Sequence, residues 1–194
     1  MMHNRKSLTT NCYTNYIITI LYVICIEMTA VGFDLPADAF TSKMRCGPHL
    51  LAPTGSDFNK YNTLNHVLAG YHSDLNFLTI HGKSRYPGLY AWTRAGEKIV
   101  VSVPDGYLLV QAGKQIEYLT GGHVMAGYHE VVVNEKTMDV IASRKAENKS
   151  LWRVSSTLFS HIESDAVLQP YEQFYKHCKS KEEEEQLRAK FPPI

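Results

Sequence analysis

The sequence predicts a mainly β protein of sandwich or barrel type, with helical segments at both ends. From Gly47 onward, short apolar segments alternate with turn residues, a pattern typical of all-β sandwiches and barrels. Two of these turns, at residues 94–96 and 104–106, end in glycine. We expect each to form a tight hairpin, because glycine tolerates the positive φ that such a turn needs. A chain of 194 residues, 44% of them hydrophobic and 20% charged, is sufficient for one domain with a substantial core.

The predicted strands are defined by these apolar segments. They span residues 49–53, 77–80, 88–93, 98–103, 107–112, 123–133 and 151–162.

The region before the strands is predicted to be helical over residues 27–45, with a break at Leu35–Pro36 and a cap from Asp34 or Asp38. An apolar run at residues 16–26 precedes it. A membrane-spanning helix needs about 20 such residues, so this run is too short to cross a bilayer. It fits either the core of a signal peptide, with a cleavage point near Thr29–Ala30, or a buried helix. We expect the buried helix and a cytoplasmic protein.

The chain is predicted to divide into three parts. Residues 1–46 form an N-terminal helical segment, a remnant of a longer region or, at 1–30, a targeting segment. Residues 47–163 form the β domain, within which the charged, alanine-rich stretch 135–149 is a loop or short helix. Residues 164–194 form a C-terminal tail, whose charge run at 179–185 predicts a solvated helix.

Charge and cysteine content limit the classes of partner. The chain has 20 Lys and Arg against 19 Asp and Glu, so it has no net field to attract nucleic acid. The cysteines Cys12, Cys25, Cys46 and Cys178 form no C-x-x-C pair. This spacing argues against a structural zinc site and a disulfide scaffold, and favours free thiols in a reducing compartment.

One stretch, A-G-Y-H-S-D-L-N-F-L-T-I-H-G at residues 69–82, combines polar and apolar residues in an unusual way. His72 and Asp74 lie two residues apart, so in extended backbone their side chains share a face. A second imidazole, from His123 or His129, would complete a two-histidine-one-carboxylate triad, the ligand set of non-haem Fe(II) oxygenases. His129 is preferred because it begins a β-branched run, whereas His123 follows two glycines and suits a turn. The alternative is a buried hydrogen-bonded pair without a metal.

Residues 47–162 resemble the catalytic domain of the Fe(II)- and 2-oxoglutarate-dependent dioxygenases, in their isopenicillin N synthase-like branch. The motifs that resemble the family occur in the same order as in the family. They are His72-Ser73-Asp74 with Leu78-Thr79, Pro87-Gly88-Leu89, Val103-Pro104, Val110-Gln111-Ala112-Gly113, Leu119-Thr120-Gly121-Gly122 with His129-Glu130-Val131, and Arg153-Val154-Ser155.

This resemblance implies a double-stranded β-helix, or jelly roll, and assigns roles to particular residues. His72, Asp74 and His129 match the iron ligands, and Arg153 with Ser155 matches the pair that binds the far carboxylate of 2-oxoglutarate. An arginine can bind a carboxylate through two parallel hydrogen bonds, which a lysine cannot. Asn76, on the same face as the first two ligands, is predicted to lie on the substrate side.

The implied activity is oxidation, with hydroxylation as the default, of a small organic substrate. The implied cofactor is Fe(II), with 2-oxoglutarate and oxygen as cosubstrates and ascorbate as an optional reductant. No nucleic acid partner and no membrane span are expected. Some members of the branch are oxidases that need no 2-oxoglutarate.

Several positions depart from the family pattern. Glu130 stands where an arginine is usual, Lys114 where an aspartate is common, and Leu50–Thr54 replaces a tyrosine-rich strand. The 135–149 insert also makes Arg144 a rival carboxylate ligand, although Arg153 is preferred because it shares a β-like segment with Ser155. The remaining histidines, apart from His3 and His177, are interpreted as structural or surface residues: His49, His66, His81, His123 and His161.

Two other functions stay open. The short N-terminal region favours a catalytically impaired jelly-roll binding module that retains its metal site. A secreted carbohydrate-binding jelly roll would require a cleaved N-terminus.

Overall fold

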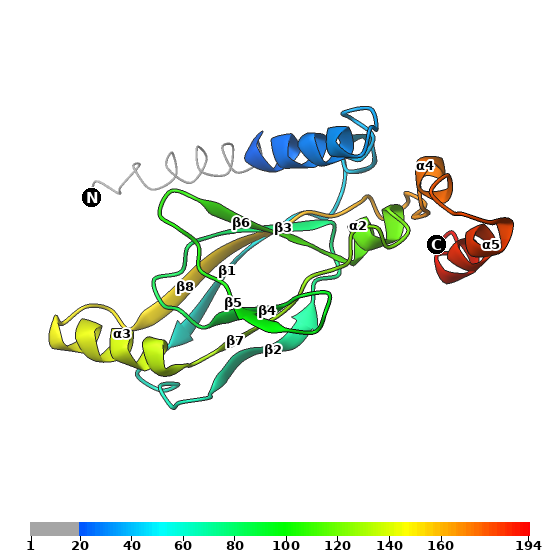
Figure 1. Ribbon diagram of the computed structural model, residues 1–194. Coiled ribbons are helices and arrows are strands. Elements are labelled where there is room, and N and C mark those ends of the chain that lie inside the picture. Colours follow the sequence, from blue (N-terminus) through cyan, green and yellow to red (C-terminus); the bar gives the residue numbers. More distant parts are fainter. Residues whose placement is uncertain (1–19) are drawn as a thin grey trace, which may run out of the picture.

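The computed structural model describes residues 20–194, in which two antiparallel β-sheets lie face to face (Figure 1). One sheet has the strand order β1-β8-β3-β6 and the other β2-β7-β4-β5. The strands are β1 (Leu50–Asp57), β2 (Val67–Ser73), β3 (Leu78–Gly82), β4 (Leu89–Trp92), β5 (Lys98–Val100), β6 (Leu108–Ala112), β7 (Tyr128–Val132) and β8 (Trp152–Phe159). The mainly β prediction is therefore confirmed.

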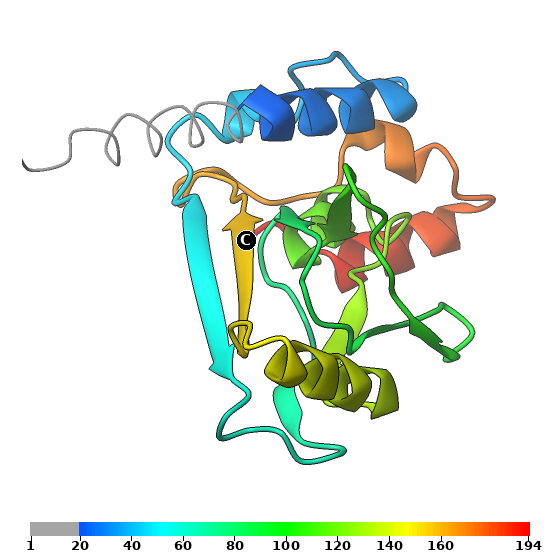
Figure 2. The same ribbon diagram turned by 90° about the vertical axis from the view of Figure 1, so that its left-hand side faces the viewer.

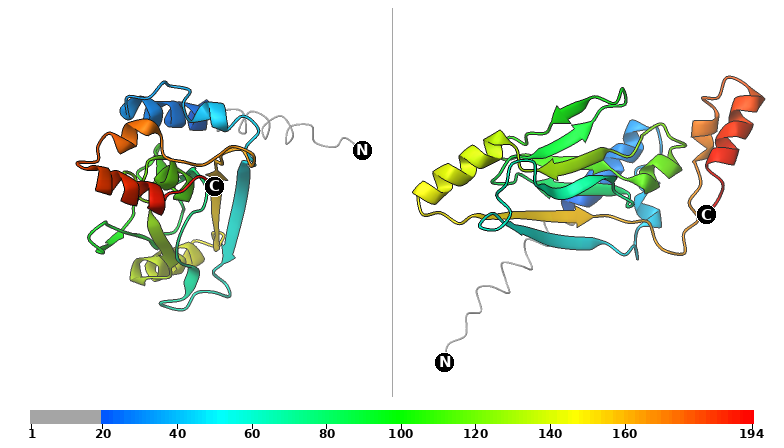
Figure 3. Two further views of the ribbon diagram at one scale, coloured as in Figure 1. Left: turned by 90° about the vertical axis from the view of Figure 1, so that its right-hand side faces the viewer. Right: turned by 90° about the horizontal axis from the view of Figure 1, so that it is seen from below.

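Helices lie at opposite ends of the two sheets. At one end is α3 (Glu135–Ala146), seen nearest the viewer in Figure 2. At the other end are α2 (Lys114–Leu119), α4 (Glu172–Tyr175) and α5 (Lys181–Lys190), as the right-hand view of Figure 3 also shows. Within residues 20–194, every helix is too short or too polar to cross a lipid bilayer.

The apolar core is divided between the same two ends. Near α2, the helix at residues 20–32 buries Ile26 and Ala30 against Phe77 and Leu119. Near α3, Phe58 packs edge-on against Tyr86, with ring centroids 4.7 Å apart, and Ile141 joins them.

The N-terminal helical prediction is only partly correct. A helix spans residues 20–32, and a single 3₁₀ turn, Thr41–Lys43, follows after a break. The break agrees with Pro36, which has no N–H to donate, but Asp34 adopts φ 56° and caps nothing. The 3₁₀ turn also has no side-chain cap. The predicted apolar run at 16–26 falls partly outside the described residues, as does any signal peptide.

The two predicted glycine turns have different roles. Residues 94–96 join the paired strands β4 and β5 as a hairpin, with Gly96 at φ +83°. Gly106 also has positive φ, but β5 and β6 belong to different sheets, so this turn carries the chain from one sheet to the other. The hairpin prediction is confirmed for the first turn and wrong for the second.

The sequence did not indicate β2 or α2. Strand β2 pairs with β7 with two register shifts, so its side chains do not alternate regularly between apolar and polar positions. The charged insert forms the helix α3, which begins with a capping box between Asn134 and Thr137. The tail forms α4 and the exposed, charge-rich α5, as expected for a solvated helix.

Candidate metal centre

Strand register brings the two predicted histidine ligands together. His72, near the end of β2, lies directly across from His129 of β7, and their ring centroids are 4.3 Å apart. Asp74 follows β2 by one residue. Its Oδ1 lies 3.6 Å from His72 Nε2 and 3.9 Å from His129 Nε2. In the described part of the chain, these three residues form the one group of His, Cys, Asp or Glu side chains close enough to hold a metal ion.

Hydrogen bonds fix which atoms face the shared point. The backbone carbonyl oxygens of Gly70 and Gly127 lie 2.6 Å and 3.1 Å from the Nδ1 atoms of His72 and His129. Each Nδ1 therefore carries the proton that it donates, which leaves Nε2 with its lone pair toward Asp74. Asp74 Oδ2 accepts a 2.6 Å hydrogen bond from Thr79 Oγ1, so Oδ1 is the oxygen left for the shared point.

This arrangement fits a cation. Three acceptor atoms converge, two of them on buried residues (Asp74 and His129 are each 8% exposed). Such a cluster is costly to bury unless a positive charge compensates it. The three atoms lie within 4.8 Å of one another, against the roughly 3 Å expected for neighbouring ligands about 2.1 Å from one ion.

A cavity of about 340 Å³ extends from this cluster between the two sheets. Arg153 and Ser155 of β8 line the same cavity, as their i, i+2 spacing on one strand face requires. Burial lowers the pKa of Arg153, and its Nε is buried without a hydrogen-bond acceptor. A guanidinium that faces a cavity and has an unpaired buried donor is suited to bind a carboxylate.

The rival arginine lies elsewhere. Arg144 is a half-buried residue of α3, its Nε donates to the backbone oxygen of Ser150, and its guanidinium lies over the ring of Tyr86. It does not line the cavity. The geometry therefore supports the preference for Arg153.

Asn76 is placed differently from the prediction. It is 2% exposed, its Nδ2 donates to Leu78 O, and its Oδ1 lies 3.1 Å from Thr79 Oγ1. It does not line the cavity, because it holds the turn between Asp74 and β3 instead of facing a substrate. The expectation of a substrate-side role is therefore not supported.

The sequence interpretation missed a polar residue inside the cavity, His81. His81 lies on the same face of β3 as Thr79, and its Nε2 is 3.1 Å from Gln111 Nε2. Burial lowers the pKa of His81, and the nearby His129 and Arg153 lower it further. Its spacing of two residues from Thr79 could have revealed this position, because alternate residues of a strand share a face.

The departures at Glu130 and Lys114 do not disturb the cluster. Glu130 pairs with Lys98 of β5 at 2.5 Å, and Lys114 pairs with Glu117 of α2 at 2.9 Å. Both charges are therefore compensated by partners outside the cavity.

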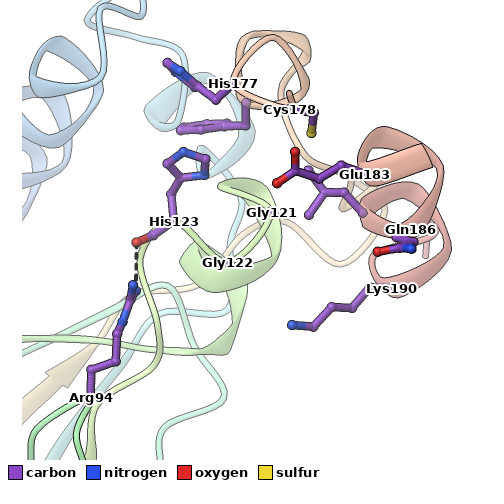
Figure 4. Close-up of a pocket in the computed structure, with 11 residues that line it drawn as sticks. Arg94, Gly121, Gly122, His123, His177, Cys178, Glu183, Gln186 and Lys190 are labelled. Carbon is purple, nitrogen blue, oxygen red and sulfur yellow. Dashed lines mark hydrogen bonds between the residues drawn. The ribbon is translucent and has the colours of Figure 1, made fainter. Parts of the chain in front are cut away.

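A separate cavity of about 490 Å³ lies between the turn at Gly121–Gly122 and the C-terminal helices (Figure 4). Arg94 donates to the backbone oxygen of His123, whose ring lies 5.2 Å from that of His177. The rival imidazole, His123, lines this cavity and follows a glycine turn as expected, whereas the residues preferred for the metal and the cosubstrate do not line it.

Comparison with known proteins gives a fold but no close sequence relative. No protein-family model matches the sequence, and no curated protein matches it at a significant level. Among solved structures, a full-length Neurospora crassa protein in complex with alpha-KG and thymine superposes with a TM-score of 0.70 at 17% identity, over 96% of this chain and 57% of that one. The fold is that of the 2-oxoglutarate/Fe(II) oxygenases.

Two other solved structures with this oxygenase fold are similar. AtDAO1, the dioxygenase for auxin oxidation 1 from Arabidopsis thaliana, was solved with 2-oxoglutarate and matches with a TM-score of 0.66 at 21% identity, over 81% of this chain and 53% of that one. JOX2, solved with 2OG, Fe and JA, matches with a TM-score of 0.64 at 19% identity, over 90% of this chain and 49% of that one. The chain thus spans about half the length of the structures that it matches.

Proposed function

We propose that this chain is a non-haem Fe(II) oxygenase that couples decarboxylation of 2-oxoglutarate to oxidation of a small organic substrate. The observation that carries this proposal is the convergence of His72 Nε2, Asp74 Oδ1 and His129 Nε2 on one cavity that also holds Arg153. Solved neighbours contain 2-oxoglutarate, iron or a small molecule such as thymine, which supports the same ligands here.

The fold supports a jelly-roll assignment within this proposal. Strand pairs β1–β8, β2–β7, β3–β6 and β4–β5 alternate between the two sheets, which is the pairing that a double Greek key produces. We assign the catalytic domain to residues 47–163 and the branch to the isopenicillin N synthase-like enzymes, on the strength of the Arg153–Ser155 pair.

The residues have distinct tasks in the proposed reaction. His72, Asp74 and His129 would hold Fe(II) by one face and leave three positions open. Arg153 and Ser155 would bind the distal carboxylate of 2-oxoglutarate and so fix the orientation of its keto-acid end. Bound Fe(II) would supply oxygen activation, with 2-oxoglutarate, oxygen and substrate converted to succinate, carbon dioxide and hydroxylated product.

The cavity contributes shielding. Phe159, Leu89 and Val131 line it beside the polar groups, which limits the water that can reach the reacting atoms. The hydroxyl of Thr79 and the carbonyls of Gly70 and Gly127 keep the three metal-binding side chains in place.

Succinate release tests the proposal. Purified protein is incubated in air with Fe(II) and 2-oxoglutarate, and succinate is measured in the parent, in His129→Ala and in His66→Ala. His66 is a matched control because its ring stacks on Tyr61 away from the cavity. We expect metal-dependent succinate in the parent and in His66→Ala, and none in His129→Ala. Metal binding without succinate release in the parent would instead support the binding module.

A further inference from the structure

A second, basic cavity lies behind Arg153. It has a volume of about 220 Å³ and lies between the β3–β4 connection, the β5–β6 connection and the start of α3. His81, Leu89 and Arg153 line both this cavity and the one that contains the metal-binding cluster. The two cavities are therefore neighbours that share a wall.

The ionisable groups that line the basic cavity are almost all positively charged or basic. Its ionisable side chains include Lys83, Arg85, Lys136, Arg153 and His81, and no aspartate or glutamate lines it. Lys83 is compensated by Asp105, whose Oδ1 lies 2.7 Å from Lys83 Nζ on the exposed side. Within residues 20–194, no carboxylate lies within ion-pair distance of Arg85, Lys136 or Arg153.

Arg153 makes this excess of positive charge unfavourable for the stability of the folded protein. Its Nε is buried and has no hydrogen-bond acceptor in the described part of the chain. A partly buried cation without a counter-charge is destabilising, so binding of an anion would lower the free energy of the folded protein. A guanidinium presents donors on more than one edge, so one carboxylate in the first cavity need not satisfy all of them.

We propose that the basic cavity is a second anion site, which binds a small polyvalent oxyanion such as a phosphate group. The volume exceeds the roughly 30 Å³ that a water molecule occupies in the liquid, so it has room for one such group and several waters. A polyvalent anion suits the site better than a single carboxylate, because Arg85, Lys136 and Arg153 approach it from three different segments of the chain.

The shared wall couples this site to the first cavity. An oxyanion beside Arg153 compensates the same guanidinium that the proposed 2-oxoglutarate carboxylate would use. The two anions therefore repel each other, and each lowers the affinity of the other by the same factor. This coupling rests on the proposed function, whereas the anion site itself does not.

Calorimetric titration of the metal-free full chain with inorganic pyrophosphate tests the site, in the absence of any 2-oxo acid. The test variant is Arg85→Ala with Lys136→Ala, since both residues are exposed and neither lines the metal-binding cavity. The matched control is Lys60→Ala with Lys145→Ala, which removes two exposed lysines that line neither cavity.

We expect saturable binding of one pyrophosphate by the parent and the control, and binding weaker by about tenfold or more in the test variant. Absence of saturable binding by the parent in the millimolar range would overturn the proposal, as would equal affinity of the two double variants. Because neither iron nor 2-oxoglutarate is present, this outcome is separate from failure of the succinate assay.

Discussion

The two oxygens of the Asp74 carboxylate have different neighbours, and this difference organises the candidate metal centre. Oδ2 accepts the 2.6 Å hydrogen bond from Thr79, while Oδ1 faces the two histidines. Thr79 itself is 2% exposed, so bulk water does not compete for the hydrogen bond of its hydroxyl. A neutral residue outside the three-residue cluster thus determines which carboxylate oxygen faces the two histidines.

Replacement of Thr79 by valine tests this positioning role. Valine keeps the shape but removes the hydroxyl, so we expect affinity for Fe(II) or Co(II) to fall about 10- to 100-fold. Thr120→Val is the control, because Thr120 is fully buried but bonds to Ile116 O in α2, away from the cluster. Metal titration followed by absorbance measures the effect. Equal losses of affinity in both variants would show a general loss of stability instead.

Substitution of each arginine by lysine distinguishes the two carboxylate-binding candidates. Arg153→Lys keeps the charge but loses the planar fork, so we expect 2-oxoglutarate affinity to fall by about tenfold or more. Arg144→Lys should leave it unchanged, since Arg144 lies outside the cavity. Calorimetry with 2-oxoglutarate in the presence of Mn(II) provides the measurement, and the reverse order of effects would contradict the assignment.

The lowered pKa of His81 makes stability depend on pH. Below the usual histidine pKa of about 6.5, the unfolded chain takes up a proton that the folded protein resists. The free energy of unfolding should therefore decrease as the pH falls through about 6.5, until the lower folded pKa is reached. His161, whose pKa burial also lowers, contributes in the same direction.

Urea unfolding at a series of pH values checks this dependence on His81. In His81→Leu, the decrease in the free energy of unfolding between about pH 7 and pH 5 should be smaller than in the parent. An unchanged slope would assign the effect to other groups.

At the scale of secondary-structure elements, pairing between strands positions the functional side chains. His72 and His129 meet only because β2 and β7 pair in one register, and two register shifts precede that point in β2. A slip of one residue would turn His129 to the outer face. The connection from β3 to β4 contributes to the same arrangement, since Gly88 brings β4 against β7.

Gly88 provides a test of this connection. It adopts φ +120°, and an added Cβ would lie 2.3 Å from the backbone oxygen of Val132. We expect Gly88→Ala to lower the free energy of unfolding by about 2 kcal/mol or more, because both the backbone conformation and the contact oppose it. Gly82→Ala, where a Cβ would meet nothing within 4 Å, should change it by less than about 0.5 kcal/mol. Chemical denaturation compares the two, and similar effects would refute the argument.

At the scale of the whole molecule, local patterns predicted the mainly β architecture, and the spacing of motifs together with the family resemblance predicted that His72, Asp74 and His129 cluster. Spacing placed His72 and Asp74 on one face, and the β-branched run marked His129 as a strand residue. The sequence did not reveal β2, because its bulges break the alternation of apolar and polar residues. It also did not reveal that His81 lines the cavity. Asn76 was misjudged because strand periodicity does not extend through the turn after β2. Which end of the sheets α3 covers, and hence the basic cavity, depends on tertiary packing that no local pattern encodes.

The side chain of His72 is 46% exposed, whereas those of Asp74 and His129 are 8% and 10% exposed. One member of the cluster thus stands at the molecular surface, and its rotation would open a route for an ion without disrupting either sheet. Loading and loss of a metal should then proceed within the native state, at rates far above global unfolding. A chelator should remove the metal from the protein while the circular dichroism spectrum stays constant. The same preparation should bind metal again when metal ions are added back.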